Sequence, residues 1–190
     1  MSDILQGHAT AQWQRLLAES QAACERRLDE SSESYLVFCL QRFMSRPEMA
    51  EAVLALEYLH GQELLGRQRT GALRDVGDQC LLYSGLFPRR AERRRVPVQY
   101  YVELGRTAYA QLAAELEETM GELFAHLSED FVAMMDVLQT LRSLGSEGPL
   151  LDPWDDAALA RDLGSRAALR RLQALTDGFL APVGDEDAPH

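Results

Sequence analysis

The segment LRDVGDQCLLYSGLF, residues 73–87, decides the fold class of this 190-residue chain. Its pattern is helical, and no charged residue occurs from Cys80 to Phe87. Glycine inside a helix costs about 1 kcal/mol relative to alanine. The pair Gly77 and Gly85 therefore predicts that neighbouring helices approach closely here, or that the helix breaks locally beside a site. We expect this helix, ended by Pro88, at the centre of the fold.

Asp78 is a carboxylate within that apolar segment. If its side chain is buried, it needs a partner, because an unpaired buried charge is strongly unfavourable. Arg106 is our candidate partner, and Asp78 would then be a polar residue of the core. The alternative is that Asp78 faces solvent, and the sequence leaves both open.

Helical periodicity recurs outward from this segment over most of the chain. The apolar pattern that begins at Val98 spans some 45 residues, or about 65–70 Å as one straight helix. A compact chain of this length has a radius of gyration of about 16 Å. We therefore predict a break near Ser128, whose hydroxyl could cap a new helix. Other helices are expected over residues 13–28, 35–44, 45–65, 69–88, 150–164 and 165–179.

These patterns predict an all-α fold, a single-domain helical bundle of about seven helices over residues 1–180, followed by a loose acidic tail at 181–190. Hydrophobic residues make up 46% of the chain, but no apolar run approaches the roughly 20 residues that cross a bilayer. The first residues show no secretory signal, so we expect a cytoplasmic protein. Cys24, Cys39 and Cys80 are expected to be reduced core residues.

Charge is unevenly distributed along the chain. The formal net charge is −11, yet residues 67–106 carry nine arginines and four acids, and the chain has no lysine. Within this segment, the arginine-rich band from Arg89 to Arg106 predicts a site for an acidic protein partner or an anionic ligand. Alternatively, the arginines pair with the chain's own acids or are solvated; nucleic acid is disfavoured because the rest of the chain is acidic. The candidate residues are Arg89, Arg90, Arg93, Arg94, Arg95, Tyr100, Tyr101 and Arg106.

The stretch VGDQCLLYSGLFPRRAERRRVPVQYYVELGRTAY, residues 76–109, resembles a group of uncharacterised all-helical proteins of proteobacteria. The likeness covers roughly residues 30–145. It implies a bacterial, cytosolic setting and transfers no catalytic residue.

A carboxylate–histidine set offers a second functional hypothesis. Glu57 and His60 have the i, i+3 spacing of helical di-iron sites, and Glu122 and His126 could add ligands from another helix. This set is only half of a complete site, so we expect no cofactor. The segment DPWDD, residues 152–156, is typical of a capped helix start.

The sequence shows no nucleophile–base constellation, so an enzyme is disfavoured. Our expectation is a non-enzymatic interaction or regulatory protein that uses the arginine-rich band. A helical-bundle metalloprotein built on Glu57, His60, Glu122 and His126 is the alternative. The oligomeric state is left open.

Overall fold

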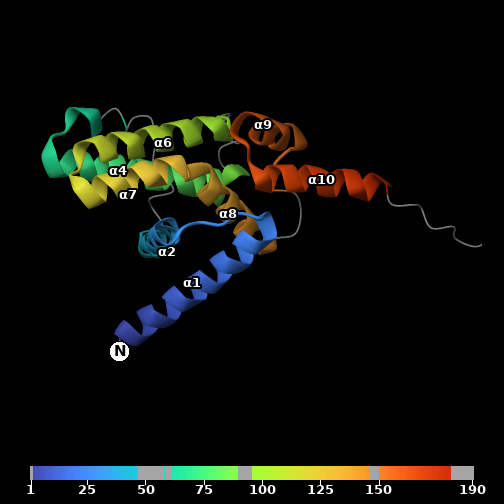
Figure 1. Cartoon of the computed structure of the whole chain (residues 1–190), viewed down its shortest axis with the longest axis horizontal. Coiled ribbons are helices and arrows are strands. Elements are labelled where there is room, and N and C mark those ends of the chain that lie inside the picture. Colours follow the sequence, from blue (N-terminus) through green and yellow to red (C-terminus); the bar gives the residue numbers. More distant parts are fainter. Residues whose placement is uncertain (1, 47–57, 59–60, 90–95, 146–149, 181–190) are drawn as a thin grey trace, which may run out of the picture.

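The computed structural model describes residues 2–46, 58, 61–89, 96–145 and 150–180. Every regular element in these residues is a helix, which confirms the all-α class (Figure 1). The helix expected over 45–65 and the tail at 181–190 lie largely or wholly outside this part of the chain. The helices are α1 (Ser2–Cys24), α2 (Glu30–Ser45), α4 (Gly66–Gly85), α6 (Val98–Glu115), α7 (Glu118–Glu129), α8 (Phe131–Leu144), α9 (Pro153–Leu163) and α10 (Arg166–Leu180).

Helix α4 occupies the centre of the fold, as predicted. All ten residues from Val76 to Gly85 are buried, and α6 and α8 pack against this helix (Figure 1). The glycines permit close approach: a Cβ at Gly77 would overlap the ring of Tyr109, and one at Gly85 would lie 2.5 Å from Leu138 Cβ. Helix α4 runs unbroken through Gly77, so close packing is the correct alternative.

The long apolar pattern after Val98 divides twice. The second division falls at Asp130, two residues after the predicted break. The predicted cap is wrong, because the Ser128 hydroxyl donates instead to the Arg106 carbonyl at 3.0 Å. The first division, at Leu116 and Glu117, was not predicted; it lets α7 fold back beside α6 (Figure 1).

A missing side chain makes this first turn possible. A Cβ at Gly121 would lie only 2.8 Å from the carbonyl oxygen of Leu116. Gly121 therefore allows the start of α7 to pack directly against the end of α6.

The connection from α4 to α6 has the predicted limits. Helix α4 ends at Gly85, three residues before Pro88, and α6 begins at Val98 with Pro97 as its N-cap. Residues 90–95 of the arginine-rich band lie outside the described residues.

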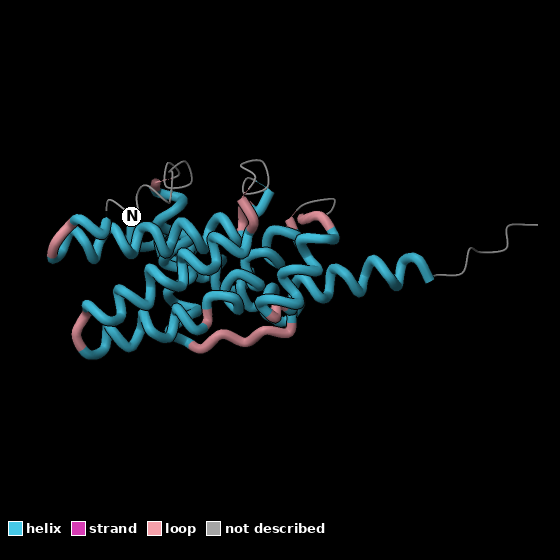
Figure 2. Tube along the Cα trace, turned by 90° about the horizontal axis from the view of Figure 1, so that it is seen from above, coloured by secondary structure: helices cyan, strands magenta, loops and turns pink. Residues whose placement is uncertain are grey.

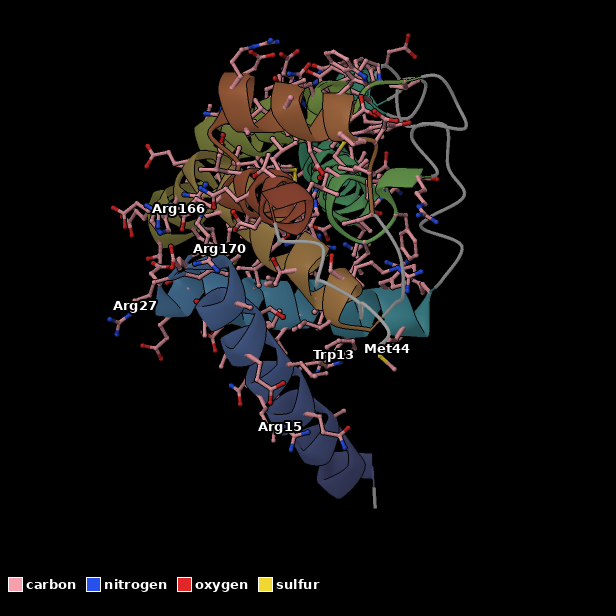
Figure 3. The ribbon with its side chains drawn as sticks, turned by 90° about the vertical axis from the view of Figure 1, so that its right-hand side faces the viewer. Trp13, Arg15, Arg27, Met44, Arg166 and Arg170 are labelled. Atoms are coloured by element: carbon pink, nitrogen blue, oxygen red, sulfur yellow. The ribbon has the colours of Figure 1, made fainter. Side chains whose placement is uncertain are left out.

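Helices α1 and α2 cross the layer of α4, α6 and α7. Figure 3 shows α1 leaving the body, with Arg15 on its projecting half. At its other end, Arg166 and Arg170 of α10 both reach Glu25, through its carbonyl and its carboxylate respectively. None of the described helices is both long enough and apolar enough to span a bilayer.

Two short helices follow, as expected. Asp152 caps α9 by accepting a hydrogen bond from the Trp154 N–H at 2.9 Å, and Pro153 occupies the first turn. Gly164, at φ +64°, ends α9 and allows the chain to enter α10, which extends beyond the body (Figure 2).

Replacing Gly77 with alanine should destabilise the fold by about 2 kcal/mol, because the new methyl group displaces the buried Tyr109 ring. Gly71→Ala on the same helix is the matched control. Nothing lies within 4 Å of a Cβ there, so this change should stabilise by up to about 1 kcal/mol. Urea unfolding measures the free energy of unfolding of both variants, and equal values would contradict close packing at Gly77.

Candidate functional site

A polar network built on Asp78 lies in the centre of the core. The carboxylate is fully buried and accepts hydrogen bonds from the hydroxyls of Tyr35 at 2.6 Å and Tyr109 at 2.9 Å. Its other oxygen accepts from Nη1 of Arg42 at 2.6 Å. Asp78 therefore connects α2, α4 and α6 through both of its oxygens.

Arg42 completes this network at the protein surface. Its side chain is only 9% exposed, and its Nη2 pairs with Asp75, one helical turn from Asp78. Burial raises the pKa of Asp78, and the hydrogen bonds from both tyrosines and the charge of Arg42 act in the opposite direction. The planar guanidinium thus bridges two carboxylates on α4, a geometry that lysine cannot provide.

The predicted partner of Asp78 was wrong. Arg106 is exposed, and its Nε donates to the carbonyl of Ser128 at 3.2 Å. Its neighbour Gly105 is the residue that faces α4, and successive helix positions are rotated by about 100°. Arg106 therefore points away from the α4–α6 contact, whereas Tyr109 points into it.

A second buried carboxylate, Asp136 on α8, binds two segments that lie far apart in the sequence. It accepts from Nε of Arg26 at 2.8 Å, from the Ser165 hydroxyl at 2.5 Å and from the Arg166 N–H at 2.9 Å. Its side chain is fully buried. Asp136 therefore joins the segment after α1 to the start of α10.

A third carboxylate, Asp156, performs the same task for α9. The guanidinium of Arg171 donates to both of its oxygens, at distances of 2.6–3.1 Å. The same Arg171 donates to Gln139 at 2.7 Å, and Gln139 donates to the Ser84 carbonyl at 2.8 Å. The DPWDD segment thus provides both a helix cap and a core anchor.

The described residues of the expected arginine-rich site differ in exposure. Arg89 and Tyr100 are exposed, but Tyr101 is only 3% exposed and stacks on Tyr83 with ring centroids 5.4 Å apart. Tyr101 is therefore a core residue. Arg90, Arg93, Arg94 and Arg95 lie outside the described residues.

The expected metal set is described only in part. Glu57 and His60 lie outside the described residues, and Glu122 is exposed on α7. His126 is half-buried, and the neighbouring carboxylates that contact it are those of Asp29 and Asp130. All three cysteines are buried and free, and burial raises the pKa of Cys39 and Cys80.

A groove of about 460 Å³ lies between α2, α4, α6 and α7. This volume is within the usual range for small-molecule sites. Two large apolar side chains at the groove are unusually exposed, Phe38 by 45% and Met120 by 49%. The apolar lining includes Tyr35, Phe38, Leu112, Met120, Leu123 and Phe124.

Two arginines of α4, Arg67 and Arg74, also line this groove, together with Thr70. The Nε atom of Arg74 is buried and has no hydrogen-bond partner among the described residues; Asp75 Oδ1 lies 4.0 Å away. A buried donor without a partner is unfavourable, and a charged one more so. The groove therefore combines an apolar surface with two cationic side chains, Arg67 and Arg74.

No family model, curated protein or solved structure matches the chain. The geometry of the groove and of the polar clusters is therefore the basis for inferring function.

Sequence reasoning missed residues that carried a usable signal. Asp136 lies within the apolar run Phe131–Leu138, and Arg42 within the apolar run of α2, just as Asp78 lies within that of α4. A lone charge in a buried helical run indicates a core ion pair. The groove carried no such signal, because four helices far apart in the sequence form it.

The phenols of Tyr35 and Tyr109 should resist alkaline titration. Burial raises the pKa of each well above its ordinary value, and the neighbouring charge of Asp78 raises it further. Because the folded state holds these protons more tightly, the stabilisation is complete below about pH 10 and is lost as pH rises above it. Phenolate absorbance should show at least two of the six tyrosines ionising only as helical circular dichroism is lost.

Tyr35→Phe and Tyr109→Phe should each remove one late-titrating phenol. Ionisation of all tyrosines near pH 10 with the helical signal intact would contradict the network.

Proposed function

We propose that the protein is a non-catalytic binding protein for an anionic ligand with an apolar body, held in the groove between α2, α4, α6 and α7. The observation that carries this proposal is the position of Arg67 and Arg74 in the lining of an apolar groove. A carboxylate or phosphate group of the ligand would pair with the exposed part of the Arg74 guanidinium, whose side chain is 40% exposed.

The charge of the chain supports an anion as the ligand. Arg67 and Arg74 belong to the positive segment 67–106 of a protein whose net charge is −11. The proposal keeps the anionic ligand expected from the sequence and assigns it to two arginines that line a hollow. The arginine-rich band begins at the other end of α4 and stays a separate prediction.

The apolar lining supports a ligand with an apolar body. Phe38 and Met120 expose large surfaces at the groove, and covering apolar area is worth about 25 cal/mol per Å². A volume of about 460 Å³ favours a small molecule over a partner helix, which would need a long continuous groove.

The neighbouring acid supports a binding role rather than catalysis. Tyr35 lines the groove, but its hydroxyl is donated to Asp78, and both oxygens of Asp78 are occupied and buried. These groups stabilise the fold and hold the groove wall in place.

Calorimetric titration with decanoate as the probe tests this function. We expect Arg74→Gln to weaken decanoate binding about fivefold to tenfold, because one charged hydrogen bond is lost at a partly exposed site. Decan-1-ol, which lacks the charge, should bind wild type more weakly and should not distinguish wild type from Arg74→Gln. Phe38→Ala should weaken both probes.

Arg15→Gln, on the projecting half of α1, is the control for a general loss of positive charge and should bind decanoate as wild type does. Loss of decanoate binding in Arg89→Gln but not in Arg74→Gln would instead place the anion site at the arginine-rich band. Absence of decanoate binding to wild type, with binding of an acidic amphipathic peptide, would refute a small-molecule site.

A further inference from the structure

A histidine and two aspartates converge where three helix ends meet. Asp29 is the N-cap of α2, His126 is in the last turn of α7, and Asp130 lies between α7 and α8. Nε2 of His126 lies 2.9 Å from Oδ2 of Asp29 and 3.5 Å from Oδ2 of Asp130. One ligand atom from each residue lies within 4.8 Å of the other two.

These separations suit a shared cation. Ligands about 2.0–2.2 Å from a tetrahedral zinc ion lie about 3.3 Å from one another, and the two measured distances fall on either side of that value. Nε2 of His126 is buried, and it forms no acceptable hydrogen bond despite its 2.9 Å approach to Asp29. The 2.9 Å approach of Nε2 to Oδ2 of Asp29 is close enough for both atoms to bind one ion.

Ser32 orients both carboxylates. Its N–H donates to Oδ1 of Asp29 at 2.7 Å, which leaves Oδ2 of Asp29 for the cation. Its hydroxyl donates to Oδ2 of Asp130 at 3.1 Å. Hydrogen bonds of this kind fix the orientation of ligands in metal sites. Burial acts to raise the pKa of Asp29, but the Ser32 hydrogen bonds and the proximity of His126 outweigh it and lower the pKa.

We propose that Asp29, His126 and Asp130 bind a divalent transition-metal ion such as zinc, and that the ion clamps the start of α2 to the α7–α8 junction. The side chains are 47%, 40% and 29% exposed respectively, so water can complete the coordination. Imidazole and carboxylate ligands suit zinc and similar ions. The site keeps His126 of the expected metal set but replaces its carboxylates, and it is independent of the groove.

Equilibrium dialysis of untagged, chelator-treated protein against zinc tests this site. We expect wild type to bind one zinc ion per chain. His126→Ala should abolish this binding, and Asp29→Asn should weaken the zinc affinity by more than about tenfold. Asparagine caps helices as well as aspartate does, so Asp29→Asn should remove the ligand charge and preserve the start of α2. His60→Ala is the control and should bind zinc as wild type does.

Thermal unfolding gives an independent readout. Zinc should raise the melting temperature of wild type and of His60→Ala, and should leave that of His126→Ala and Asp29→Asn unchanged, because binding to the folded state alone stabilises it. If zinc fails to bind wild type, or binds His126→Ala equally well, the proposal is wrong. A lower melting temperature of His126→Ala without any zinc effect would assign the cluster to an internal ion pair.

Discussion

The ion pair between Asp78 and Arg42 is the interaction on which the rest of the fold depends. Two charges removed from water are unfavourable unless each is fully hydrogen-bonded. Asp78 meets that condition by accepting from Arg42, Tyr35 and Tyr109, which lie on α2 and α6. Because these donors come from separate helices, a single carboxylate fixes how α2, α4 and α6 sit against one another.

Two further buried carboxylates, nearer the C-terminus, also bind donors from other parts of the chain. Asp136 binds Arg26 and the start of α10, and Asp156 binds Arg171, which also reaches α8 through Gln139. Glycines at the helix contacts leave little space for side chains to rearrange, so these polar groups are held in position. Tyr35 belongs both to the lining of the groove and to the Asp78 network, so the network also holds part of the groove wall in position.

Much of the fold could be predicted from the sequence, because helical periodicity and glycine placement act locally. The central place of α4, the division near Ser128 and the capped start of α9 all follow from such local signals. The partner of Asp78 could not be predicted, because it depends on how α2 crosses α4. The spacing of residues along the sequence does not determine how two helices are oriented relative to each other. The groove escaped prediction for the same reason, and so did the convergence of Asp29 with His126, which lie 97 positions apart.

A double-mutant cycle on Arg42 and Asp78 tests the central claim most directly, with the free energy of unfolding measured in urea. Arg42→Met and Asp78→Asn should each cost about 3–5 kcal/mol, since each leaves a buried group without its partner. The double variant should cost less than the sum by about 1–3 kcal/mol, whereas Arg106→Met should be additive with Asp78→Asn. Additive effects of Arg42→Met and Asp78→Asn, or single costs below about 0.5 kcal/mol, would contradict the account.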